Sequence, residues 1–138
     1  MKKLIFLFAA FLLCYSAKAQ TFKIVNSSCD PIVVEVQAGS STSGCSASWF
    51  TKPIILSAGT TSPTFTTSTM PWSGSSPSGS VVYLNASVAG NPGPCHATIV
   101  QISACGSPTG AYTTCYCSGS YTVTFSTDAS GNVTLTVS

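Results

Sequence analysis

Apolar and polar residues alternate along several short segments of this chain, a pattern typical of strands with one buried and one solvated face. Between residues 32 and 38 every second residue is apolar, and the predicted buried face consists of Ile32, Val34, Val36 and Ala38. Within 81–88 the same alternation predicts a buried face that consists of Val82, Leu84, Ala86 and Val88. Shorter or less regular strands are predicted at 21–26, 49–56, 62–67 and 100–104.

The carboxyl-terminal segment has the clearest strand pattern. Tyr121, Val123 and Phe125 alternate with threonine and serine, and residues 133–137 repeat the alternation. The intervening residues 128–132, Asp-Ala-Ser-Gly-Asn, are turn formers. We therefore expect a β-hairpin at this end of the chain.

No segment after residue 19 has the 3.6-residue spacing of an amphipathic helix, because glycine, proline, serine and threonine interrupt every candidate. Pro53 interrupts the strand at 49–56 and makes it an edge strand. Residues 57–80 contain 14 serines and threonines, and part of this segment is expected to form a long surface loop. The sequence predicts an all-β fold, an antiparallel β-sandwich of about eight short strands, with a small β-barrel as the alternative.

Residues 1–19 have the organisation of a signal peptide. A Met-Lys-Lys start precedes an apolar run at 4–15, and Ala17 and Ala19 are the small residues that a signal peptidase recognises. The run is shorter than the ~20 apolar residues that span a bilayer. We expect cleavage after Ala19 and a single mature domain, residues 20–138, that is secreted or at the cell surface.

An even number of cysteines remains after this cleavage, which in an exported chain predicts a disulfide framework that staples the sandwich. The framework consists of Cys29, Cys45, Cys95, Cys105, Cys115 and Cys117. Cys115 and Cys117 share one face of an extended segment and are expected to bond to different partners. We favour pairing Cys29 with Cys45, which leaves the other four cysteines to pair among themselves.

A metal site is the alternative use of these cysteines. It would combine Cys95, His96 and Cys105 with the Cys115 and Cys117 pair. Only one residue separates Cys115 from Cys117, whereas paired ligands of structural zinc are usually two to four residues apart. The sequence therefore predicts disulfides and no metal.

The mature domain carries little charge. Lys23 and Lys52 stand against Asp30, Glu35 and Asp128, a net charge of −1, and the chain has no arginine. Nucleic-acid binding requires several cations that neutralise phosphates, so this function is excluded.

The residues needed for catalysis are also scarce. His96 is the one histidine, and no Gly-x-Ser-x-Gly elbow provides a nucleophile for a serine–histidine–acid triad. Each of the three mature acids has a structural explanation in a turn or on a polar strand face, and no cofactor signature occurs. We expect a protein that is not an enzyme and has no cofactor.

The segment 21–26, Thr-Phe-Lys-Ile-Val-Asn, followed by Cys29 and a further strand, resembles the first two strands of thaumatin-like proteins. Residues 56–61 with Phe65, and then 81–84, occupy places comparable to the next strands of that family. The resemblance implies a disulfide-rich β-sandwich that in some members binds β-glucans, although the family's acidic cleft has no match here. The signal also resembles in style those of small exported proteins of Bacteroidota-like bacteria.

Trp72 lies in the serine- and threonine-rich segment, where nothing apolar nearby in the sequence can bury it. We expect its ring either to fold back onto the sandwich, which we favour, or to face a ligand together with Trp49, Tyr112 and Tyr116. The sequence thus predicts a non-catalytic module that binds an extracellular glycan or a cell-surface partner. The alternative is a structural protein that self-associates through uncharged strand edges into a surface, fibre or matrix.

Overall fold

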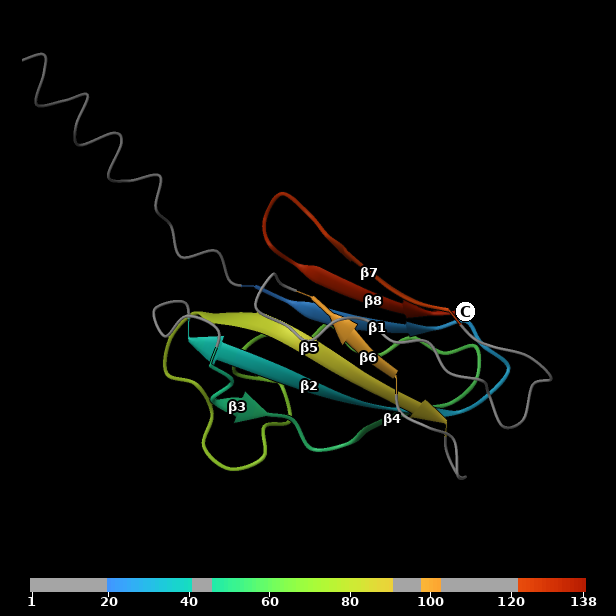
Figure 1. Ribbon diagram of the computed structural model, residues 1–138, viewed down its shortest axis with the longest axis horizontal. Coiled ribbons are helices and arrows are strands. Elements are labelled where there is room, and N and C mark those ends of the chain that lie inside the picture. Colours follow the sequence, from blue (N-terminus) through green and yellow to red (C-terminus); the bar gives the residue numbers. More distant parts are fainter. Residues whose placement is uncertain (1–19, 41–45, 91–97, 103–121) are drawn as a thin grey trace, which may run out of the picture.

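The computed structural model describes residues 20–40, 46–90, 98–102 and 122–138, and all the regular structure in these ranges is β-strand. The strands are β1 Phe22–Asn26, β2 Ile32–Ser40, β3 Trp49–Phe50, β4 Ile54–Leu56, β5 Val81–Gly90, β6 Thr98–Gln101, β7 Val123–Thr127 and β8 Val133–Val137 (Figure 1). Nowhere in these ranges is there a helix with the length and apolar character required to cross a membrane.

The strands form two sheets. The three-stranded sheet has the order β1-β8-β7, and the five-stranded sheet has the order β3-β2-β5-β6, with β4 also paired to β2. The predicted all-β fold is confirmed. The alternative of a small closed barrel is wrong, because the strands belong to two separate sheets.

β1 and β8 pair in parallel, from Phe22 opposite Val133 to Asn26 opposite Val137. The other described strand pairs are antiparallel. The prediction of a wholly antiparallel sandwich is therefore wrong for this one pair. No tight turn joins the first strand to the last one, so their relative direction is not restricted to antiparallel as it is in a hairpin.

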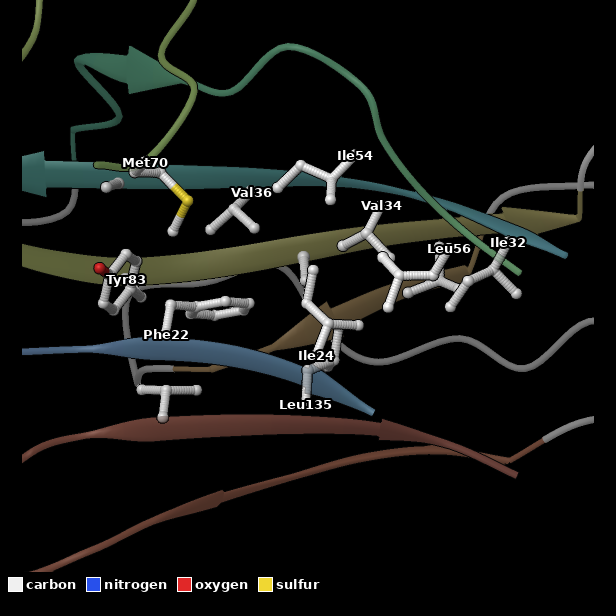
Figure 2. Close-up of a cluster of buried hydrophobic side chains, with 14 of the residues drawn as sticks. Phe22, Ile24, Ile32, Val34, Val36, Ile54, Leu56, Met70, Tyr83 and Leu135 are labelled. Atoms are coloured by element: carbon white, nitrogen blue, oxygen red, sulfur yellow. The ribbon is translucent and has the colours of Figure 1, made fainter. Parts of the chain in front are cut away.

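The inner faces of the two sheets enclose one hydrophobic core, part of which Figure 2 shows. The prediction for β2 is confirmed, because its four alternating apolar residues are fully buried. Phe22 and Ile24 of β1 and Leu135 of β8 belong to the same core from the other sheet. Each fully buried aliphatic or aromatic side chain stabilises such a core by roughly 1.5–3 kcal/mol relative to exposure.

A β-bulge interrupts the pairing of β2 with β5. Gln37 pairs with Asn85, whereas the next residue, Ala38, pairs with Tyr83. Leu84 is therefore the extra residue of β5. A bulge of one residue moves every side chain on one side of it to the opposite face of the strand.

The bulge makes the predicted alternation of 81–88 wrong in its first half. Val82 is half-buried, and Leu84 is buried but is not part of the core cluster. The residues of β5 that belong to the core are Val81 and Tyr83 before the bulge and Ala86 and Val88 after it.

Much of the serine- and threonine-rich segment packs against the sheets. Phe22 and Phe65 exchange two backbone hydrogen bonds of 2.9 and 2.8 Å. The Ser62 nitrogen donates to the Ile24 oxygen, and the Ser62 hydroxyl accepts from the Ile24 nitrogen, both at 2.9 Å. Residues 60–65 therefore cover the outer edge of β1. Residues 57–61 and most of 73–80 are exposed, as expected for a surface loop.

The predicted carboxyl-terminal hairpin is confirmed, with β7 and β8 antiparallel. One carboxylate oxygen of Asp128, Oδ1, accepts hydrogen bonds from the backbone nitrogens of Ser130 and Asn132 at 2.7 and 3.0 Å. Gly131 has a φ of 81°, a conformation that glycine adopts without strain. Residues 128–132 thus form the turn that the sequence predicted.

Cys29 is the one cysteine of the predicted framework within the described ranges, and it is disulfide-bonded. The predicted signal peptide, His96 and the remaining cysteines lie outside the described residues, and the framework as a whole stays a prediction. Those cysteines are Cys45, Cys95, Cys105, Cys115 and Cys117.

Candidate binding site

Trp72 lies in the core rather than on an exposed loop. Its side chain is 5% exposed, and its indole Nε1 donates a 2.7 Å hydrogen bond to the backbone oxygen of Thr67. A β-bridge between Thr51 and Trp72 fixes the backbone beside β3. This is the folded-back arrangement, in which the ring fills the core instead of facing a ligand.

Trp49 is the other predicted aromatic site residue that the structure describes. Trp49 begins β3 and pairs with Ala38, whose side chain is buried in the core. Residues paired across two strands lie on the same face, and Trp49 accordingly packs, partly buried, against the core. Tyr112 and Tyr116 lie outside the described residues.

Phe50, the residue after Trp49, is the exposed aromatic residue of β3. It pairs with Gln37 on the outer face of the five-stranded sheet, and 47% of its surface is exposed. Ile55 of β4 pairs with Val33 on the same face and is 65% exposed. Sequence reasoning missed Phe50, although the alternation of a strand implies that Trp49 and Phe50 face opposite ways.

Polar groups of β2 and β5 lie on the same face as these two apolar side chains. Glu35 is exposed and lies two residues from Val33 in one direction and from Gln37 in the other. Asn85 of β5 pairs with Gln37, and its side-chain Nδ2 donates a 3.0 Å hydrogen bond to Gln37 Oε1. Because Gln37 accepts through its oxygen, its Nε2 group keeps two hydrogens for other acceptors.

We call this surface the outer strip. It consists of Ile55, Val33, Glu35, Gln37, Asn85 and Phe50. Asn85 is buried, with 8% of its surface exposed, so the accessible amide of the strip is that of Gln37. Its apolar ends are centred on Val33 and Gln37, which are four residues apart on one strand and hence about 13 Å apart. The strip therefore combines apolar contact area at its two ends with the Glu35 carboxylate between them and the half-buried Gln37 amide beside Phe50. Its length exceeds that of one small-molecule ring.

The three acidic residues lie in three different places. Asp30, in the turn between β1 and β2, is 3% exposed, whereas Glu35 is on the outer strip and Asp128 is in the β7–β8 turn. Glycoside hydrolysis usually requires two carboxylates on either side of one bond. The arrangement provides a single carboxylate on the strip. Among the described residues, no three histidine, cysteine or acidic side chains are grouped as metal ligands.

Comparisons with models of protein families, with curated proteins and with solved structures find no match. The resemblance to thaumatin-like proteins thus stays a prediction from the sequence.

Proposed function

We propose that the chain is an exported, non-catalytic β-sandwich that binds an extracellular glycan through the outer strip. The observation that carries the proposal is the exposed ring of Phe50 beside the hydrogen-bonded amides of Gln37 and Asn85. It replaces the buried Trp72 as the aromatic centre of the binding site.

The chemistry of the strip matches that of a sugar. A pyranose ring has an apolar face of C–H groups and an edge of hydroxyl groups. A rigid aromatic ring provides contact area for the C–H face of the sugar at little cost in conformational entropy. The Glu35 carboxylate accepts hydrogen bonds, and the Gln37 amide donates them, so the two together suit hydroxyl groups.

The length of the strip favours an oligosaccharide over a single sugar. A ring stacked on Phe50 occupies one end, and Ile55 and Val33 provide a second apolar contact ~13 Å along β2. Glu35 lies between the two ends. With one carboxylate on the strip, binding without cleavage is the outcome that the chemistry favours.

The sequence supports the extracellular setting. The signal-like residues 1–19 lead to export, and six cysteines remain to staple the mature domain. Cys29 is disulfide-bonded, which is consistent with an oxidising compartment.

A glycan array with the mature chain, residues 20–138, tests the proposal. The glycan bound on the array is then titrated as a soluble oligosaccharide by calorimetry, with Phe50→Ala, Phe50→Tyr and Val25→Ala as variants. Loss of a central aromatic contact weakens such binding ~10-fold or more, so Phe50→Ala should raise the Kd by at least this factor. Phe50→Tyr should retain binding, because the ring remains.

Val25→Ala is the matched control, because Val25 is an apolar, half-buried residue of the other sheet, which pairs with Thr136. Its Kd should equal that of the unmodified chain. Failure of the chain to bind any glycan on the array, or equal affinities for Phe50→Ala and Val25→Ala, would contradict the proposal.

A further inference from the structure

The two edge strands of the three-stranded sheet differ in whether their outer backbone groups are paired. The outer edge of β1 is covered by residues 60–65, which pair with it through backbone hydrogen bonds. Among the strands that the structure describes, β7, at the other edge, pairs with β8 alone. β6 is the strand of the other sheet that lies near β7, and the two form no ladder.

The hairpin register determines which backbone groups of β7 point away from β8. Thr122 and Ser138 exchange two backbone hydrogen bonds, of 2.8 and 3.0 Å. Hydrogen-bonded and non-hydrogen-bonded pairs alternate along an antiparallel ladder. The N–H and C=O groups of Val123, Phe125 and Thr127 therefore point outward, away from the sheet.

β7 lacks the features with which proteins usually block an exposed edge. Its sequence, Val-Thr-Phe-Ser-Thr, contains no charged residue and no proline, and its pairing with β8 has no bulge. Four of its five residues are exposed, and Phe125 is 38% exposed. Such an edge is a template for a further strand.

We propose that β7 pairs antiparallel with β7 of a second copy of this chain, about a twofold axis at Phe125. The outward-pointing groups of Val123, Phe125 and Thr127 then form the new ladder. Val123 lies opposite Thr127 of the second copy, and Phe125 lies opposite its own counterpart. The product is one continuous sheet of six strands, β1-β8-β7-β7-β8-β1.

A second copy fits this edge better than an unrelated strand because the register is self-complementary. The three outward-pointing residues are symmetric about Phe125, so every outward donor meets an acceptor under twofold symmetry. The two Phe125 rings meet on one face of the new sheet, and Thr124 lies opposite Ser126 of the second copy on the other face. β7 contains no charged residue, so no charge repulsion arises between the two copies of this strand.

Engineered cysteines test the register directly. Paired residues in a hydrogen-bonded antiparallel pair have Cα atoms ~5.5 Å apart, which is within the range of a disulfide. Phe125→Cys in the mature chain should therefore give a covalent dimer on mild oxidation, seen by non-reducing electrophoresis. Thr124→Cys is the matched control, since two copies of residue 124 would be roughly 8 Å apart, too far for a disulfide.

Sedimentation velocity of the mature chain over a concentration series tests the association without a new thiol. The average mass should rise toward that of a dimer. Phe125→Lys should remain monomeric, because two like charges would lie directly opposite each other, whereas Thr124→Lys should still dimerise. Thermal melting of both variants shows whether they fold. The proposal is overturned if the unmodified chain stays monomeric, if it forms open polymers, or if Thr124→Cys cross-links as readily as Phe125→Cys.

Discussion

The ring of Tyr83 packs against the ring of Phe22, with centroids 4.9 Å apart and planes inclined by 59°. The contact joins β5 of the five-stranded sheet to β1 of the three-stranded sheet, in the part of the core that Figure 2 shows. A tilted aromatic pair of this kind stabilises a core by ~0.5–1.5 kcal/mol beyond the area it buries. The bulge at Leu84 makes this contact, because it places Tyr83 on the inner face.

The hydroxyl group of Tyr83 is buried and has no hydrogen-bond partner among the residues that the structure describes. A buried polar group without a partner costs ~1–3 kcal/mol, so Tyr83→Phe should raise the free energy of unfolding by about 1 kcal/mol. The aromatic contact with Phe22 is retained in this variant. Urea denaturation at neutral pH measures the change, and a lower stability of Tyr83→Phe would mean that the hydroxyl has a stabilising partner.

Burial also raises the pKa of Tyr83 from 10.0 to about 12. Between these two values the unfolded chain has lost a proton that the folded chain keeps, so ionisation favours unfolding. This ionisation leaves the stability of the folded chain unchanged below pH 10 and lowers it as the pH rises toward 12. Denaturation at several pH values should show a steeper alkaline loss for the unmodified chain than for Tyr83→Phe, and equal slopes would contradict the assignment.

The burial of Trp72 predicts a structural role. Trp72→Ala should lower the free energy of unfolding by ~3–5 kcal/mol, as large-to-small substitutions in cores do. Trp72→Phe keeps a ring in the core but loses the 2.7 Å hydrogen bond to Thr67, and it should cost less. Chemical denaturation of both variants gives the two values. Unchanged stability of Trp72→Ala would show that the ring is not part of the core.

The sequence indicated the faces of β2 and β8 correctly because alternation with a period of two directly reports burial. It does not report which strands pair or in which direction. The parallel pairing of β1 with β8 and the bulge at Leu84 both depend on a partner strand that is distant in sequence. The strand predicted at 62–67 shows the same limit: this segment forms only isolated bridges to β1, through Thr61 and Phe65, and the sequence alone does not identify β1 as its partner.

The residues of the proposed binding surface were harder to predict than the fold. Trp49 and Phe50 are neighbours, and either could have been the exposed ring. The pairing of Trp49 with the buried Ala38 settles which one points inward. Glu35 was correctly expected on a polar strand face, but its neighbours on adjacent strands become known only from the register.

The cysteine count predicts that the purified mature chain has no free thiol. Six cysteines remain after residue 19, and all should be paired in an oxidising compartment. Intact-mass spectrometry should show a gain of six hydrogens on reduction, and no alkylation of the native protein. The same spectrum should place the amino terminus at Gln20. Two or more alkylatable thiols, or zinc bound in stoichiometric amount, would rule out the framework.

Gly39 marks the tightest backbone approach near the bulge. A Cβ atom at this position would be 2.6 Å from the backbone oxygen of Ser46 and 3.4 Å from Leu84 Cδ1. Gly39→Ala should therefore lower the free energy of unfolding by ~1–3 kcal/mol, because a backbone atom must move to make room. Gly79→Ala is the control, since a Cβ there meets nothing within 4 Å, and its stability should change by less than ~0.5 kcal/mol. Equal effects of the two substitutions in urea denaturation would show that the chain from Ser46 does not pack against Gly39.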